Sequence, residues 1–139
     1  MNQLITYKQD NGTVAIIQPT EEALATMTLA QIAVKDVPAG VSYKIVNDSD
    51  IPSDRTFRNA WKDDLTVDMP KAQVITKDRL RAERKPLLQA LDVAQLRNLA
   101  DPVALANIES KKQVLRDATK QVDSLTTLDE LKAAQLPVL

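Results

Sequence analysis

Acidic side chains are the first candidates for chemistry in this sequence, because carboxylates can bind metal ions or transfer protons. Asp48, Asp50 and Asp54 are separated by serines and apolar residues, and spaced acids in a loop are the usual donors for Ca²⁺. The stretch lacks the glycine of the sharp turn and the glutamate at the twelfth position that an EF-hand loop requires. We therefore expect these acids to stabilise turns and cap helices.

Two pairs of adjacent acids could take part in acid–base catalysis. They are Asp63-Asp64 and Asp129-Glu130. Adjacent exposed acids without a pocket are usually solvated, and the chain has no histidine and no cysteine to supply the commonest general base or a thiolate. With only 2 glycines, a glycine-rich phosphate-binding loop is also excluded. The sequence therefore predicts neither an enzyme nor a bound metal ion or cofactor.

A cluster of basic residues could bind the phosphates of a nucleic acid. Its members are Lys77, Arg79, Arg81, Arg84 and Lys85. Acids interleave with them, their positions wrap around a predicted helix, and no aromatic side chain lies beside them to stack on bases. The net charge of -1 also disfavours a protein whose affinity depends on neutralising phosphates. We expect a solvated helix face, or one that forms ion pairs with another chain.

The composition limits the scaffold on which these residues can be placed. A chain of 139 residues can form one domain, or a small core with an extended arm, but not two large domains. Aromatic residues make up 3% of the chain, so the interior must be mainly aliphatic. No run approaches the roughly 18 apolar residues of a membrane-spanning helix, and the first residues do not resemble a secretory signal. We therefore expect no membrane partner and a cytoplasmic site of synthesis.

The N-terminal part has the pattern of a small β-sheet. Two β-rich runs, 4–8 and 13–17, are separated by a stretch that contains Asn-Gly, which predicts a hairpin with a type I′ turn. Two short helices are expected within 21–36, and a third strand over 41–46. Three strands with small helices are enough for a compact α+β unit.

The segment after the third strand holds two of the chain's few aromatic residues. A short helix is expected over 55–61, which would place Phe57 and Trp61 on one face because they are four residues apart. This pair could be an exposed anchor for a partner, since tryptophan is enriched at the centres of interfaces. We favour closure of the N-terminal core, because so few other aromatic residues are present. A short strand over 65–68 is expected to follow.

The C-terminal part has the pattern of long helices. One is predicted over about 70–99, and Pro86 inside it should either bend the helix or begin a new one. A second helix is predicted over about 102–120, so that two antiparallel helices form a hairpin. A last short helix is expected within 126–134. The first half of the long helix is polar nearly all round, and such a helix needs a partner or an assembly to hold it.

The residues expected to contact that partner lie in the aromatic segment and along the apolar stripe of the long helix. They are Phe57, Trp61, Leu80, Leu87, Leu88, Leu91 and Leu96. The expected fold is α+β: a small N-terminal antiparallel β unit with short helices over 1–67, then a long charged helix and a C-terminal helical hairpin over 68–139. We expect the helical part to associate with itself or to dock on a larger protein.

The sequence resembles a group of small proteins encoded in the tail and tail-fibre gene clusters of tailed bacteriophages and prophages. The resemblance lies in a series of short runs through the middle of the chain. They are Val37-Pro38-Ala39-Gly40, Tyr43-Lys44-Ile45-Val46, Ile51-Pro52, Asp54-Arg55-Thr56-Phe57-Arg58-Asn59-Ala60-Trp61 and Asp68-Met69-Pro70-Lys71-Ala72.

The C-terminal half is similar to the corresponding region of phage tail assembly chaperones. The shared features are an arginine-rich helix followed by two leucines and an acid, and later a Leu-Arg-Asp run. They are carried by Arg81-Ala82-Glu83-Arg84-Lys85-Pro86-Leu87-Leu88, Leu91-Asp92 and Lys112-Gln113-Val114-Leu115-Arg116-Asp117-Ala118-Thr119.

These resemblances imply a protein without enzymatic activity that has a structural or chaperone-like role in a phage tail or tail fibre. Its partner would be a tail or tail-fibre protein, it would be a homo-oligomer or an assembly subunit, and it would be found in the virion tail, the host cytoplasm or both. The alternative is a cytoplasmic regulatory or nucleic-acid-associated factor that uses the basic helix 71–85.

Overall fold

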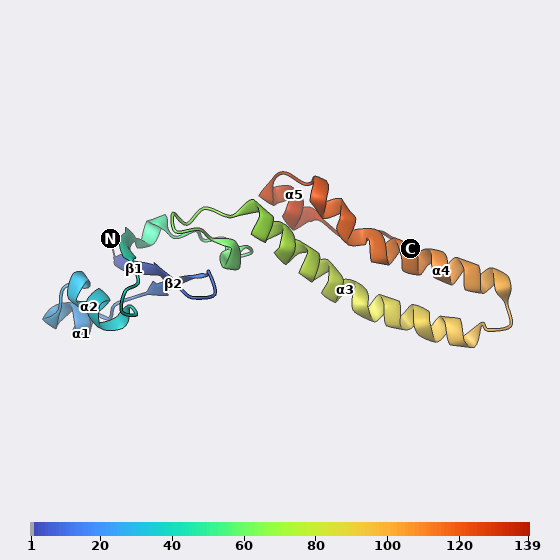
Figure 1. Ribbon diagram of the computed structural model, residues 1–139, viewed down its shortest axis with the longest axis horizontal. Helices are drawn as coiled ribbons and strands as arrows, with labels where there is room; N and C mark the ends of the chain where they lie inside the picture. The colour runs from blue at the N-terminus through green and yellow to red at the C-terminus, as the bar shows by residue number, and fades with distance from the viewer. Residues whose placement is uncertain (1) are drawn as a thin grey trace. The chain divides into compact units, whose positions relative to one another are not determined.

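The computed structural model describes residues 2–139, and the chain divides into two compact units (Figure 1). The first unit ends at Asp68 and the second begins at Met69. The first is a small antiparallel sheet with short helices, and the second consists of helices, so the predicted α+β class is confirmed. No helix within residues 2–139 combines the length and the apolar character needed to cross a lipid bilayer.

The sheet of the first unit has three strands in the order β2-β1-β3. They are β1 (Gln3–Lys8), β2 (Val14–Ile17) and β3 (Tyr43–Asn47), and both pairings are antiparallel. Ile5 of β1 lies opposite Ile17 on one side and Ile45 on the other. Because side chains alternate along a strand, Ile5 and Leu4 belong to opposite faces of the sheet, and each face needs its own cover.

The predicted hairpin is present, but its predicted type I′ turn is wrong. Gly12 has a φ of 83°, whereas Asn11 is not among the residues with a positive φ, which a type I′ turn requires at both central positions. The Gly12 N–H donates to the Gln9 carbonyl at 2.9 Å, and the Asn11 side-chain oxygen accepts from the Thr13 N–H at 3.0 Å. The side chain of Asn11 thus supports a longer loop in which glycine alone takes the left-handed conformation.

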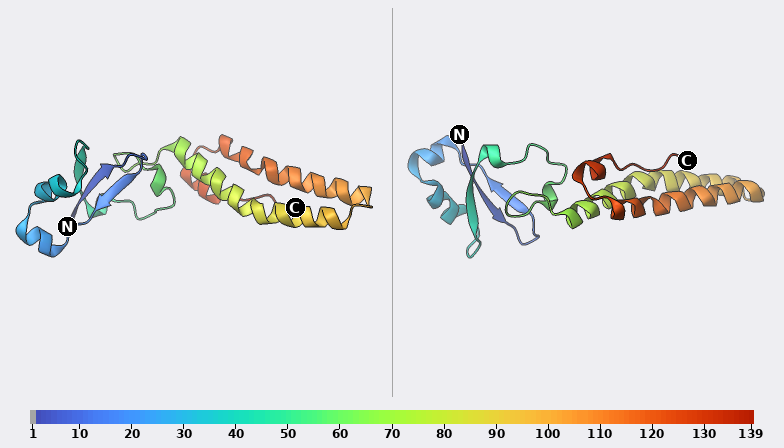
Figure 2. Two further views of the ribbon diagram at one scale, coloured as in Figure 1. Left: turned by 60° about the horizontal axis from the view of Figure 1, so that its bottom comes forward. Right: turned by 90° about the horizontal axis from the view of Figure 1, so that it is seen from above.

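Two short helices cover the sheet face that carries Ile5 (Figure 2). They are α1 (Glu21–Thr26) and α2 (Leu29–Asp36), and the side chains of Thr20 and Thr28 cap their first turns. Ile32 and Ala33 of α2 pack with Ile5 and with Val37, which ends the helix. The threonine caps make each helix begin where its apolar residues can reach the sheet.

Trp61 covers the opposite face. It is 1% exposed and packs with Val14 and Leu65. Phe57 is also buried, but the helix predicted over 55–61 is wrong, because only the 3-10 turn η2 (Arg58–Ala60) forms. The Asp54 carboxylate accepts from the Thr56 N–H at 3.0 Å and so stabilises a turn where a helix would otherwise begin. The predicted strand over 65–68 is reduced to an isolated bridge between Trp61 and Val67.

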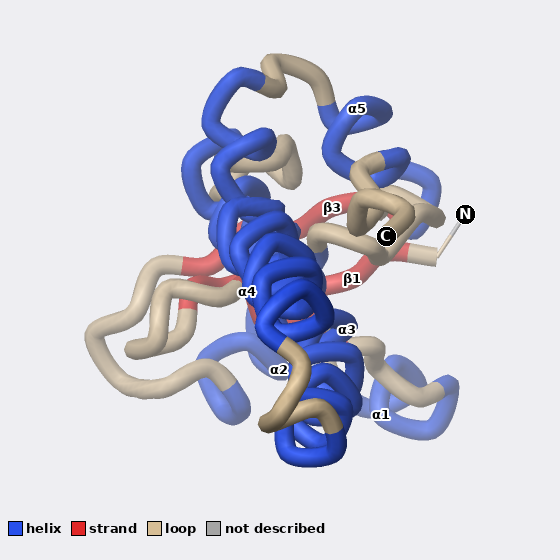
Figure 3. The backbone as a smooth tube through the Cα atoms, turned by 90° about the vertical axis from the view of Figure 1, so that its right-hand side faces the viewer, coloured by secondary structure: helices blue, strands red, loops and turns tan. Residues whose placement is uncertain are grey.

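The second unit is an antiparallel pair of helices followed by two shorter helical segments. Helix α3 spans Met69–Arg97 without a break at Pro86, so the proline does not divide it. Helix α4 (Pro102–Asp117) begins at the cap residue Asp101 and passes directly into the 3-10 segment η3 (Ala118–Ser124). Helix α5 (Leu128–Ala133) follows. Figure 3 views the chain from the end at which α3 and α4 are connected.

Candidate docking surface of the helical unit

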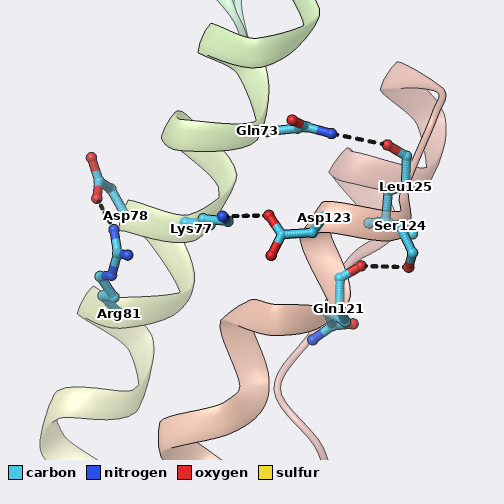
Figure 4. A network of polar contacts seen from close by, with 8 residues as sticks. All are labelled: Gln73, Lys77, Asp78, Arg81, Gln121, Asp123, Ser124 and Leu125. Carbon is cyan, nitrogen blue, oxygen red and sulfur yellow. Dashed lines mark hydrogen bonds and ion pairs between the residues drawn. The ribbon is translucent and has the colours of Figure 1, made fainter.

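Polar side chains along the first half of α3 bind the segments that return beside it. The Gln73 amide donates to the Leu125 carbonyl at 3.2 Å, at the end of η3. The Lys77 ammonium pairs with the Asp123 carboxylate at 2.5 Å (Figure 4). These contacts hold η3 against the beginning of α3.

Arg79 holds α5 in the same manner. Its guanidinium donates to the carbonyls of Leu131 at 3.2 Å and Ala134 at 2.8 Å, at the C-terminal end of α5. The last carbonyls of a helix have no partner within the helix and carry partial negative charge, so a cation placed there satisfies and stabilises them. A second nitrogen of Arg79 pairs with Glu83 on α3 at 3.1 Å.

Arg84 caps the C-terminal end of α4. One nitrogen of its guanidinium donates to the carbonyls of Leu115 at 3.1 Å and Arg116 at 2.9 Å, in the last turn of α4. Arg81, by contrast, pairs with Asp78 on its own helix at 2.8 Å. Much of the basic cluster is therefore used to connect or brace helices of the same unit.

The buried seam of the unit begins with small residues on α3. Ala72, Thr76 and Leu80 are four residues apart and buried, and the Thr76 hydroxyl donates to the Ala72 carbonyl at 3.0 Å. This bond satisfies the threonine without a partner outside the helix. Ile108 and Leu115 are buried on α4.

A charged residue lies in the seam farther along the hairpin. Lys112 of α4 is 6% exposed, and its ammonium donates to the Gln95 amide oxygen at 2.6 Å and pairs with Asp92 at 2.5 Å, both on α3. A buried charge must be paired, so a slip of one helix along the other would leave this ammonium without acceptors. The triad thereby selects one register of α3 on α4.

The connected ends of the two helices leave large apolar side chains in solvent. Leu96 is 70% exposed, Leu99 67% and Val103 72%. We name these three residues the hairpin tip. The contacts from α3 to η3 and α5 come from Gln73, Lys77 and Arg79, near its other end. Each helix of a two-helix hairpin can bury only the stripe that faces the other, so the tip has no cover within its own unit.

The residues expected to contact a partner fall into three groups. Phe57, Trp61 and Leu80 are buried inside their own units, where they build cores and are not accessible. Leu88 and Leu91 are half-buried. Leu87 and Leu96 are exposed, so of these seven residues they are the most accessible to a partner.

Leu99 and Val103 are not among the residues expected from the sequence to contact a partner. Their exposure follows from the absence of a third helix beside the α3–α4 connection, which no local pattern reveals. The capping roles of Arg79 and Arg84 were also missed, because each acceptor is a backbone carbonyl more than thirty residues away.

Several of the acids considered for catalysis or metal binding accept hydrogen bonds in local turns. The Asp50 carboxylate accepts from the Asn47 N–H at 3.1 Å, and that of Asp64 accepts from the Thr66 N–H at 3.0 Å. Hydrogen bonds from the Thr66 hydroxyl and N–H lower the pKa of Asp64 below its ordinary value of 3.8. Residues 2–139 contain no group of three or more potential metal-ligating side chains of the histidine, cysteine, aspartate or glutamate type.

The comparisons with known proteins add no relative to this description. No protein-family model matches the sequence, and no curated protein or solved structure is significantly similar to it.

Proposed function

We propose that this protein is a non-enzymatic structural or assembly component of a bacteriophage tail or tail fibre, which docks on a tail or fibre protein through its helical unit. The observation that carries the docking role is the exposure of the hairpin tip, where Leu96, Leu99 and Val103 are each about two-thirds or more exposed. Large apolar side chains gathered at one end of a hairpin favour burial against another chain.

The phage context of the proposal comes from the sequence resemblance. The runs that carry the resemblance include the arginine-rich segment of α3, and Arg79 and Arg84 in and beside this segment hold the C-terminal helices in place. A braced hairpin of this kind presents its tip at a fixed position, which lowers the entropy lost on binding. The same design suits an assembly subunit or a chaperone-like protein that covers a fibre segment until the fibre folds.

The partner surface is expected to be apolar, with polar groups at its edge. Arg97 ends α3 and Asp101 caps α4, so the tip has one basic and one acidic residue beside it. Charged residues at the edge of an apolar contact determine the orientation of the bound partner more than they increase its affinity. A second copy of the chain or a fibre segment would satisfy these requirements, and the experiments below separate the two.

The first experiment is sedimentation velocity on the full chain and its Leu96→Asp variant. If the tip mediates self-association, the wild-type chain sediments as an oligomer and the variant as a smaller species. Val74→Asp is the matched control, because Val74 is an exposed valine near the other end of the same helix. Equal oligomeric states in wild type and Leu96→Asp would contradict tip-mediated self-association.

The second experiment addresses docking on the fibre. We expect the chain to copurify with a tail or tail-fibre protein when the two are coexpressed, and Leu96→Asp to weaken this complex at least about tenfold, as expected for a hot-spot residue. Mass spectrometry of purified virions would then tell a virion component from an assembly factor. The proposed function is refuted if the chain neither associates with itself nor binds the tail or tail-fibre protein.

The alternative, a nucleic-acid-associated factor, is not favoured by the placement of its basic residues. Lys77, Arg79, Arg81 and Arg84 each contact acceptors of the same unit, which reduces the charge they can offer to phosphates. Binding to duplex DNA that falls steeply with salt concentration would revive this alternative.

A further inference from the structure

The first unit contains a polar cavity of about 420 Å³ that the docking role does not involve. Leu4 of β1 and Ile16 of β2 form an apolar part of its lining, and Gln18 and Ser53 contribute polar groups. Arg55 and Arg58 line it as well. The cavity lining therefore combines two arginines with a small apolar surface.

Arg58 has a buried donor without an acceptor. Its Nε is the one buried side-chain nitrogen or oxygen within residues 2–139 that lacks a hydrogen-bond partner. A buried unsatisfied donor is costly, and a charged one more so, so such an atom in a native structure calls for an explanation such as a bound ion or ligand. Arg58 itself is one of the residues that line the cavity.

The backbone holds the two arginines together. The Arg58 N–H donates to the Arg55 carbonyl at 3.1 Å, and the Trp61 N–H donates to the Arg58 carbonyl at 3.2 Å. Residues three apart in such tight turns lie on the same side of the chain, which is consistent with both arginines lining one cavity. Trp61 is itself buried in the core, which fixes this turn to the sheet.

Trp61 also orients Arg55. The guanidinium carbon of Arg55 lies 5.8 Å from the centroid of the Trp61 ring. A cation over an aromatic face is attracted to the ring, and this attraction leaves the N–H groups of the guanidinium able to donate to a ligand. Arg55 is thus restrained before any ligand binds.

The charge of the lining selects the class of ligand. Arg55 and Arg58 contribute two positive charges, and Asp48, which also lines the cavity, contributes one negative charge. The three side chains together carry one positive charge, which a ligand with one negative charge would neutralise. The second negative charge of a dianion such as phosphate would be repelled by the Asp48 carboxylate. Paired guanidinium donors match the two oxygens of a carboxylate, and the apolar part of the lining suits the carbon atoms beside it.

We propose that Arg55 and Arg58 form a binding site for a single carboxylate group in the cavity beside the sheet. The group is either the side chain of an acidic residue of a partner protein or a small carboxylic acid. The site lies in the first unit, so its existence does not depend on the docking role of the hairpin tip.

The test is an NMR titration of the full chain in which the Nε–H signal of Arg58 is followed. The probes are N-acetyl-glutamate amide for a protein-borne carboxylate, sodium acetate and sodium propionate for small acids, and inorganic phosphate, each compared with sodium chloride at equal ionic strength. We expect a saturable shift of the signal with a Kd of about 1 mM or below for a carboxylate probe. A preference for the glutamate derivative would identify a protein-borne group, and a preference for acetate or propionate a small acid.

The variant Arg58→Met should weaken binding of the preferred probe at least about tenfold, measured from the Arg55 and Trp61 side-chain signals, because it removes the charged donor. Arg58→Lys should weaken it as well, since lysine lacks the guanidinium fork. Arg97→Met, which alters an exposed arginine at the end of α3, is the control and should bind as wild type.

Trp61 fluorescence reports whether each variant is folded. If Arg58→Met does not fold, Arg55→Met provides the same comparison with Arg58 intact. The proposal is overturned if no carboxylate produces a saturable shift beyond that of chloride, if phosphate binds more tightly than every carboxylate, or if folded Arg58→Met binds as well as wild type.

Discussion

Leu65 illustrates how single residues determine the loop over the sheet. It is the one residue other than glycine within 2–139 that has a positive φ, at 66°, and its side chain is buried. A left-handed conformation is unfavourable for leucine, so neighbouring contacts must hold it there. The Asp64 carboxylate does so by accepting from the N–H of Thr66 at 3.0 Å and from its hydroxyl at 2.5 Å.

Replacing Asp64 with alanine is therefore expected to lower the melting temperature of the first unit, monitored by Trp61 fluorescence at neutral pH. Asp63→Ala is the matched control at the adjacent position. If the two variants melt at the same temperature, the Asp64 turn does not hold Leu65.

Asp64 also makes the stability of the first unit depend on pH. Because hydrogen bonds from Thr66 lower the folded-state pKa of Asp64 below 3.8, its contribution to stability is present above that value and is lost as the pH falls through the folded-state pKa. The difference in melting temperature between wild type and Asp64→Ala should therefore shrink as the pH falls below 3.8. A difference that is constant from neutral to acidic pH would contradict this assignment.

At the scale of elements, β3 is an edge strand, and a hydrogen bond from within the chain occupies one end of its unpaired edge. The Asp48 N–H donates to the Asn2 carbonyl at 2.9 Å, so by the alternation of an antiparallel ladder the Asn47 N–H points away from β1. The Asp50 carboxylate accepts this outward N–H at 3.1 Å. One end of the edge is thereby closed to further pairing, which is a common protection of edge strands against aggregation.

The connection between α3 and the end of α4 yields a quantitative prediction. Arg84→Ala should reduce the free energy of unfolding of the helical unit by about 1.5–3 kcal/mol, because it removes charged donors to two carbonyls of α4. Arg81→Ala, which removes an exposed pair within one helix, should cost about 0.5 kcal/mol or less. Urea unfolding followed by far-UV circular dichroism measures both, and equal losses would show that Arg84 does not cap α4.

For the whole molecule, the two units have separate buried cores. Trp61 is the only tryptophan and lies in the first unit, whereas most helical residues belong to the second. Fluorescence and far-UV circular dichroism therefore report mainly on different units.

Leu115→Ala should destabilise the helical unit by about 2–5 kcal/mol, since Leu115 is completely buried. We expect the transition measured by circular dichroism to move to lower urea concentration while that measured by Trp61 fluorescence keeps its midpoint. Coincident shifts in both signals would mean that the units unfold as one.

Local sequence determined much of the fold of this protein. The strands, the threonine caps at Thr20 and Thr28 and the α4 start at Asp101 depend on side chains a few residues apart, so they could be predicted. The turn at Asn11 and the helix expected at Phe57 were wrong because a side-chain oxygen competed with the backbone geometry that the pattern favoured. Such competition is local, but its outcome depends on small differences in energy.

The candidate sites depended on tertiary structure. The sequence determined that Leu87, Leu88, Leu91 and Leu96 are apolar and share a long helix, but burial is a property of the space between segments. Only the return of α4, and the restriction of η3 and α5 to the first half of α3, decided that Leu88 is half-buried and that Leu96 stays in solvent. Likewise, the packing of Trp61 on the sheet decided that Arg55 and Arg58 share a cavity with Leu4, about fifty residues earlier in the chain.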